Sequence, residues 1–282
     1  MSDGSEPPER IPELAAAAGC WAVALTDHDR LDGIAPARAS ARRVGVELVP
    51  GCELSCTTPW GEAHLLAYFV DEDGGPLHIE LERLQRSRER RNQQLARRLG
   101  ELGLPVTLEE MEDEAGGEGV GRPHAAAVLV RKGVVGSISE AFDVWLGEGR
   151  PGHVERERPD VQTALDATRE SGGVLVLAHP LSMGLDPAAL DRAVGELAAA
   201  GLGGLEAIYG RYTPEERQAL TALATSHGLV ATGGSDYHGR YKPDLQVGVG
   251  LGDLVVPDDV LDRLESRRPS GKPRRYAPGY GV

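Results

Sequence analysis

Short apolar runs alternate with longer amphipathic stretches along most of the chain. The apolar runs are typical of buried β-strands and lie at 21–26, 46–50, 64–70, 174–178, 204–209 and 229–233. The amphipathic stretches predict helices over about 9–18, 32–44, 160–171, 186–200 and 213–227. Such alternation is typical of a parallel sheet covered by helices. The pattern therefore predicts a βα architecture with six strands, two fewer than the common eight-stranded barrel.

Residues 77–158 interrupt this alternation. Leucines recur at helical spacing from Leu81 to Leu102, which predicts one long helix. An acidic loop from Glu109 to Glu118 is expected next, followed by shorter helical pieces around 122–132 and 137–147. We interpret the whole segment as a small helical subdomain inserted after a barrel strand.

The chain of 282 residues is long enough for one large domain with such an insertion. The expected division is a barrel built from residues 1–76 and 159–266, the insert 77–158 between them, and a C-terminal tail over 267–282. The tail contains Pro, Gly, Arg and Lys without periodicity, which is typical of loosely held termini.

Composition narrows the class of partner. The net charge of −14 argues against a stable, charge-driven complex with nucleic acid. The chain has no apolar run of the length that a membrane span requires, and no signal-peptide pattern at its start, so we expect a cytoplasmic protein. Cys52 and Cys56 could form half of a zinc site, but with no second pair we expect buried, reduced thiols. No feature indicates a particular oligomeric state.

Residue types that bind metals follow or open the predicted strands again and again. The set comprises His28, Glu53, His64, His179, Asp236 and His238. Strand ends meet at one face of a βα fold, so we expect these side chains to converge. A single histidine at a strand end is more often structural, but six such residues favour a Zn²⁺, Mn²⁺ or Fe²⁺ site. Two or three such ions suit phosphoryl chemistry, because they neutralise the phosphate and activate a water.

Longer motifs surround these residues. They are Ser2-Asp3-Gly4, Thr26-Asp27-His28-Asp29, Gly51-x-Glu53, Gly121-Arg122-Pro123-His124, Ala178-His179-Pro180 and Gly234-Ser235-Asp236-Tyr237-His238. With them, nearly the whole chain closely resembles the PHP (polymerase and histidinol phosphatase) family. Within that family it is most similar to the nucleoside 3′,5′-bisphosphate phosphatases and related 5′→3′ exoribonucleases.

The resemblance implies an irregular seven-stranded βα-barrel with up to three divalent ions, commonly manganese, zinc or iron. Glu53 would bridge two ions, His64 and His179 would complete the second, and Asp236 would bind the first. The third ion would be held by Asp3, His28 and His238.

The implied activity is hydrolysis of phosphomonoester or phosphodiester bonds of nucleotides by metal-activated water. Glu53, Asp236, His238 and Arg122 would be the catalytic residues, and Arg122 and His124 would lie on the substrate side. Arg122 suits bidentate binding of a phosphate, although both residues fit the start of a helix in the insert equally well. Arg90, in an arginine-rich helix, is a further expected substrate contact, whereas most of that helix's arginines are expected to be solvated surface.

The chain departs from the family pattern at one point. Family members begin with a strand that ends in His-x-His, just ahead of the motif that is Ser2-Asp3-Gly4 here. We expect this strand and its two histidines to lie upstream of Met1 because of a misplaced translation start. Without them the first ion would have only Glu53 and Asp236, which leaves a degenerate, nucleotide-binding non-enzyme as an alternative.

Two other enzyme classes share parts of this pattern. A histidinol-phosphatase-like activity shares the barrel, but the insert with its Gly-Arg-Pro-His segment favours the nucleotide branch. An amidohydrolase-type barrel often uses a modified lysine at a strand end. None of the three lysines, Lys132, Lys242 and Lys272, lies at a predicted strand end, which argues against that class.

Overall fold

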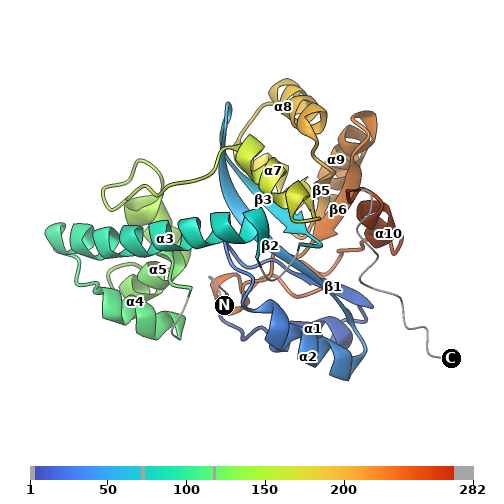
Figure 1. Cartoon of the computed structure of the whole chain (residues 1–282). Helices are drawn as coiled ribbons and strands as arrows, with labels where there is room; N and C mark the ends of the chain where they lie inside the picture. Colours follow the sequence, from blue (N-terminus) through green and yellow to red (C-terminus); the bar gives the residue numbers. More distant parts are fainter. Residues whose placement is uncertain (1–3, 71–73, 117–118, 270–282) are drawn as a thin grey trace.

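A computed structural model describes residues 4–70, 74–116 and 119–269 (Figure 1). One sheet of six strands forms its centre and curls into a half-barrel, with the strands adjacent in chain order. The strands are β1 (Ala22–Leu25), β2 (Glu47–Thr58), β3 (Gly61–Tyr68), β4 (Val174–Leu177), β5 (Gly204–Tyr209) and β6 (Val230–Gly234). All six predicted strands are therefore present.

The expectation of a wholly parallel sheet is wrong for β3. It runs antiparallel to both β2 and β4, whereas β1–β2 and β4–β5–β6 are parallel pairs. Only residues 59–60 separate β2 from β3, and a connection this short can only reverse the chain. Strand β2 is also longer than predicted, so Glu53 lies within it and not after its end. His64 likewise lies inside β3 and does not open it.

Reversal of β3 places His64 at the edge where the parallel strands end. The backbone N–H of Ala178, directly after β4, donates to the His64 carbonyl at 2.9 Å. On the other side, the segment after β1 continues to pair with β2. The Glu53 N–H donates to the Asp27 carbonyl at 3.1 Å, and the Asp29 N–H donates to the Glu53 carbonyl at 3.0 Å. These contacts bring three distant segments to one edge of the sheet.

Helices cover the outer face of the sheet as predicted. They are α1 (Arg10–Ala17), α2 (Ile34–Val44), α7 (Val161–Glu170), α8 (Pro187–Ala200) and α9 (Pro214–Ser226). Leu54, Leu65, Leu177 and Leu205 are fully buried in the main core beneath them. The short helix α10 (Val260–Glu265), which was not predicted, packs in a separate cluster with Val49 and Leu66. No helix among the described residues is both long and apolar enough to cross a bilayer.

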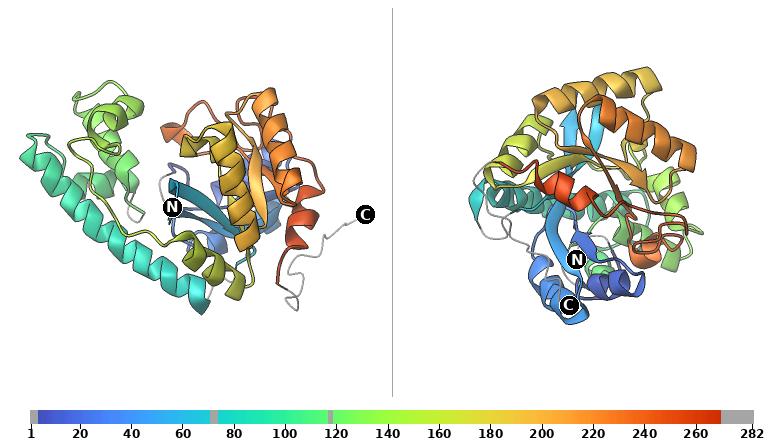
Figure 2. Two further views of the ribbon diagram at one scale, coloured as in Figure 1. Left: turned by 90° about the horizontal axis from the view of Figure 1, so that it is seen from above. Right: turned by 90° about the vertical axis from the view of Figure 1, so that its right-hand side faces the viewer.

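The segment between β3 and α7 is helical and carries a hydrophobic cluster of its own. It contains α3 (Gly75–Glu101), α4 (Leu108–Ala115), α5 (Arg122–Arg131), α6 (Ile138–Ala141) and the π-helix η1 (Phe142–Leu146). Leu95, Leu99, Met111, Leu129 and Leu146 are buried together there. Figure 2 (left) shows α3 reaching away from the sheet, with the shorter helices beside its far end.

One part of that segment differs from the expectation. The acidic stretch from Glu109, expected as a loop, forms helix α4 up to Ala115. Thr107 accepts a hydrogen bond from the Glu110 N–H, and the Glu110 side chain accepts one from the Thr107 N–H, so a capping box starts the helix. Residues 117–118 lie outside the described residues. The acidic composition therefore reflects helix capping and exposure, not a loop.

A buried ion pair ties α3 to the sheet. Asp29 is fully buried, and its Oδ2 lies 2.6 Å from Arg88 on α3 and 2.5 Å from Arg156. Burial alone would raise the pKa of this carboxyl, but the two guanidinium groups lower it to about 2. Gln85 adds a hydrogen bond to the Asp29 carbonyl at 2.9 Å. The helix is therefore attached through charge as well as through packing.

Removing the charge of Asp29 should destabilise the protein strongly. In Asp29→Asn, two nearly buried guanidinium groups lose their carboxylate, and we expect a loss of about 3–5 kcal/mol in the free energy of unfolding. Asp32→Asn is the matched control, because its pair with Arg30 is half exposed and should contribute no more than about 1 kcal/mol. Denaturant unfolding of both variants measures the difference. Equal losses would contradict the role of Asp29.

Candidate metal centre

The carboxylate of Glu53 lies at the centre of the candidate site. Its Oε1 is 2.6 Å from His64 Nδ1 and 3.2 Å from His179 Nε2, and its Oε2 is 3.7 Å from His28 Nε2. The imidazole rings of His28 and His64 lie edge to face with centroids 5.1 Å apart, as do those of His64 and His179. The structure therefore brings together four of the predicted ligands from four separate segments.

These residues fit a divalent ion. One ligand atom from each of His28, Glu53 and His64 can be chosen so that all lie within 4.8 Å of one another. Imidazole nitrogens with carboxylate oxygens are the donor set that Zn²⁺, Mn²⁺ and Fe²⁺ sites use.

The same residues are electrostatically coupled. Burial opposes the charge of Glu53, but His28 and His64 hold the pKa of its carboxyl well below the usual range. Burial likewise works to lower the pKa of His64, while Glu53 and Glu62 raise it to about 10. Each group is thus stabilised in its charged form by its neighbours. A bound divalent ion would take the place of the protons on these imidazoles, because a histidine must be neutral to act as a ligand.

Asp236 and His238 form the second part of the site, just after β6. Asp236 Oδ2 accepts hydrogen bonds from Tyr209 Oη at 2.7 Å and from Lys242 Nζ at 2.5 Å. His238 Nδ1 lies 3.2 Å from Asp236 Oδ1. The predicted ligand Asp3 lies outside the described residues, although the N–H of nearby Ser5 donates to the His238 carbonyl at 3.3 Å.

Backbone strain is concentrated around the centre. Asp29, His179 and Asp236 have φ angles of 56°, 23° and 52°, in the left-handed region that non-glycine residues rarely adopt. Each such residue costs on the order of 1–3 kcal/mol unless its surroundings hold it. His179 is held through its N–H, which donates to Glu206 Oε2 at 2.8 Å. Strain of this kind is typical of functional sites.

Glu206 is a site residue that the sequence reasoning missed. It lies on β5, is 4% exposed, and lines the same cavity as Glu53 and Asp236. Burial raises the pKa of its carboxyl to about 7, and the charges of Asp236 and Glu53 act in the same direction. The available signal was an acidic residue inside the otherwise apolar run 204–209.

Glu206 should make the stability of the metal-free protein depend on pH. Its pKa is higher in the folded than in the unfolded chain, so its contribution is present below about pH 4.5 and is lost as the pH rises through about 7. In Glu206→Gln, which keeps an acceptor for the His179 N–H, this loss of on the order of 3 kcal/mol should disappear. Thermal unfolding in EDTA across this pH range measures the difference in stability between the variant and the wild type. The exposed Glu196→Gln variant is the control, and its difference from wild type should not change with pH. If the difference for Glu206→Gln also stays constant across this range, the role of Glu206 is contradicted.

Arginines gather beside the centre. The cluster comprises Arg88, Arg91, Arg122, Arg156 and Arg158. Arg158 lies 2.8 Å from Glu62, which in turn lies 3.6 Å from His64, so the cluster adjoins the candidate metal ligands. Arg91 is 4% exposed, and its Nε has no hydrogen-bond partner among the described residues. Burial and the four neighbouring guanidinium groups hold its pKa well below the usual range.

Three predicted substrate residues have different outcomes. Arg122 belongs to the cluster, and its guanidinium lies 5.7 Å from the centre of the Phe142 ring. His124 is buried and accepts the Gly121 N–H at 2.9 Å, as the alternative of a helix start implied. Arg90 does not face the centre, because its side chain is 60% exposed and pairs with Glu157. The structure thus shows no contact of Arg90 with the centre, and the neighbouring Arg91 is the buried arginine.

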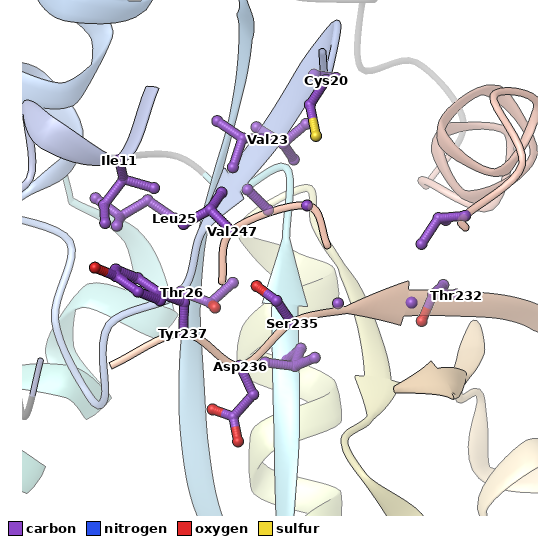
Figure 3. Close-up of a pocket in the computed structure, with 18 of the residues that line it drawn as sticks. Ile11, Cys20, Val23, Leu25, Thr26, Thr232, Ser235, Asp236, Tyr237 and Val247 are labelled. Atoms are coloured by element: carbon purple, nitrogen blue, oxygen red, sulfur yellow. The ribbon is translucent and has the colours of Figure 1, made fainter. Parts of the chain in front are cut away.

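A cleft of about 500 Å³ lies between β1 and β6. Within the described residues each of these strands pairs with only one other strand. Figure 3 shows apolar side chains such as Val23, Leu25 and Val247 along the cleft, with Asp236 toward one end. The cleft therefore runs between the two edges of the half-barrel and reaches Glu53 and Asp236 of the candidate metal centre.

Comparisons with known proteins agree with this architecture. A model of the PHP domain matches residues 1–113. The chain is 36% identical over 242 residues to the 5'-3' exoribonuclease Rnm of Escherichia coli (strain K12), covering 84% of this chain and 82% of that protein. It is 30% identical over 250 residues to the 3',5'-nucleoside bisphosphate phosphatase of Chromobacterium violaceum, covering 88% and 87%.

A solved structure has the same fold. It belongs to a protein of Bifidobacterium adolescentis with a provisional description as a metal-dependent phosphoesterase. The TM-score is 0.84 at 30% sequence identity, and the match covers 94% of this chain and 92% of that one. Given these likenesses over most of its length, the chain belongs to the PHP domain family.

Proposed function

We propose that the protein is a metal-dependent phosphoesterase that hydrolyses phosphate esters of nucleotides, namely nucleoside 3′,5′-bisphosphates or short oligoribonucleotides. The observation that carries this proposal is the position of a buried arginine cluster directly beside the Glu53 centre. A site that combines a metal centre with an arginine cluster can bind the phosphate of an ester at the metal centre. It can bind a second phosphate of the same substrate at the arginines. The names of the relatives support the nucleotide class.

Up to three divalent ions, Mn²⁺, Zn²⁺ or Fe²⁺, are the proposed cofactors. Bound ions would supply neutralisation of the phosphate and a lowered pKa of water. The residues proposed to hold them are Asp3, His28, Glu53, His64, His179, Asp236 and His238. Glu53 has the central place, because three imidazoles surround its two oxygens.

The arginine cluster is the proposed phosphate-binding surface. An unpartnered guanidinium nitrogen buried in protein is unfavourable unless an anion satisfies it. Arg91 is in this position, and Arg122 is the second arginine that we place on the substrate. Both residues lie on helices of the segment between β3 and α7, so this segment would contribute to substrate binding.

We also propose the seven-stranded barrel and the domain division that the family resemblance implies. The cleft between β1 and β6 is the place we assign to the seventh strand that the family pattern puts ahead of Ser2. Such a strand would pair with both open edges and bring its two histidines toward Glu53 and Asp236. We further propose 77–158 as the inserted subdomain, 1–76 and 159–266 as the barrel, and 267–282 as a tail of a cytoplasmic enzyme.

Nucleotide binding without turnover is the second candidate. It is favoured by the contacts of Asp236, whose Oδ2 already accepts hydrogen bonds from Lys242 and Tyr209 where the first ion would bind. It predicts that the nucleotide binds while no phosphate is released. The assay below separates the two candidates.

Phosphate release from adenosine 3′,5′-bisphosphate tests the proposed activity. We expect release that requires Mn²⁺, stops with EDTA, and falls at least about 100-fold in kcat for Glu53→Gln, because a central ligand is lost. The exposed Glu196→Gln variant is the control and should keep wild-type rates. Nucleotide binding without any release at saturating Mn²⁺ would rule out the enzyme and favour the second candidate.

Arg91 and Arg90 provide a matched pair for the substrate site. Arg91→Met should raise KM for the bisphosphate by roughly 10- to 100-fold, since a hydrogen bond to a charged group is lost. Arg90→Met removes the same charge from the helix surface and should leave KM within about twofold. Steady-state kinetics on both variants, with circular dichroism as the check on folding, provide the comparison. Equal effects would contradict the assignment of Arg91.

A further inference from the structure

Lys242 is in close contact with Asp236, one of the proposed metal ligands. Its ammonium Nζ lies 2.5 Å from Asp236 Oδ2, and the Tyr209 hydroxyl donates to the same oxygen at 2.7 Å. The other oxygen, Oδ1, lies 3.2 Å from His238 Nδ1. Both oxygens of Asp236 are therefore engaged by donors of this chain. The Lys242 ammonium is thus already paired with the carboxylate that would bind the first ion.

The backbone that carries Lys242 is anchored. Lys242 ends the short helix η3 (Gly239–Tyr241), and its N–H donates to the Gly239 carbonyl at 3.1 Å. Arg240 lies 2.8 Å from Glu114 on α4. The Tyr241 ring packs edge to face with the His124 ring on α5 at 5.4 Å. These contacts fix the base of the lysine against the helical segment.

The side chain itself has room to move. The Lys242 side chain is 32% exposed, whereas that of Asp236 is 11% exposed. A lysine is a point charge on a flexible stem and can swing its ammonium into solvent without moving its backbone. A guanidinium locked in several hydrogen bonds would lack this freedom. Lys242 can therefore release Asp236 at a modest free-energy cost.

An ammonium and a divalent ion would compete for Asp236. Both bind the carboxylate through its charge, and two cations at one buried oxygen repel each other. We propose that Lys242 is a positioning residue that acts as a tethered counter-ion: it occupies Asp236 until a divalent ion displaces it, and so weakens binding of that ion. This inference rests on the proposed function, because it takes Asp236 as a metal ligand.

The inference sets an order of loading. Among the described residues, the ion pairs of Glu53 are all with imidazoles and none is with a lysine or arginine, so ions should fill the Glu53 cluster first. The Asp236 side should fill second, after Lys242 has moved. The lysine thereby preserves the charge balance around Asp236 when little metal is present.

The experiment is calorimetric titration of Mn²⁺ into the full chain after EDTA treatment and desalting. Lys242→Met should tighten the Asp236-dependent binding step by about 3- to 10-fold, because the competing ion pair is partly exposed and therefore modest. Lys242→Arg keeps the charge and should not tighten that step. Lys132→Met, on the helical segment, removes a lysine elsewhere and should match wild type.

Thermal unfolding adds a second readout. Without metal, Lys242→Met should unfold at a lower temperature than wild type, since Asp236 loses its partner. With Mn²⁺ the gain in Tm should be larger than in wild type. A purely structural lysine would lower both values without enlarging the gain.

Asp236→Asn separates the two levels of the argument. If it weakens Mn²⁺ binding while Lys242→Met binds no tighter than wild type, the inference on Lys242 is overturned and the metal assignment stands. If Asp236→Asn leaves Mn²⁺ binding unchanged, Asp236 is not a ligand, and both the assignment and the inference fail. Tighter binding in Lys242→Met together with weaker binding in Asp236→Asn supports both.

Discussion

Glu53 holds its negative charge inside the protein, and most of the unusual features of the structure lie around it. Three imidazoles contact its two oxygens, and their charges keep its pKa far below the value that burial alone would produce. To bring them there, β3 reverses, the segment after β1 continues to pair with β2, and His179 adopts a positive φ angle. A divalent ion at this point would turn a costly charge cluster into a stable centre, so the fold and the proposed chemistry share one electrostatic requirement.

Much of the fold could be predicted from local pattern. The six strands follow from short apolar runs, and helices such as α8 and α9 begin at the capping residues Asp186 and Thr213. Strand direction was not accessible in the same way, because periodicity reports burial and not orientation. The predicted strands 46–50 and 64–70 lay far apart in the sequence, so the two-residue connection that makes β2 and β3 a hairpin became visible only in the structure. Acidic residues from Glu109 suggested a loop, whereas a capping box makes them a helix.

The site residues likewise fall into those that the sequence predicted and those that only the structure revealed. His28, Glu53, His64 and His179 were predicted because ligand types recur near strand ends, and the structure brings them into contact. The contacts that support them were not found by spacing. Asp29 belongs to the motif around His28, but its pairing with Arg88 and Arg156 exists only in the folded chain. Glu206, which holds the His179 N–H, was missed altogether. Arg90 and Arg91 are adjacent, so charge counting could not tell which faces inward. Helix packing decides it in favour of Arg91.

Anomalous diffraction from crystals loaded with Zn²⁺ is the most direct test of the central claim, that Glu53 organises a metal centre. The account predicts an anomalous peak at coordination distance, about 2.0–2.2 Å, from a Glu53 oxygen and from at least one imidazole of His28, His64 or His179. Zinc found only at surface carboxylates, with Glu53 still contacting the histidines directly, would contradict it.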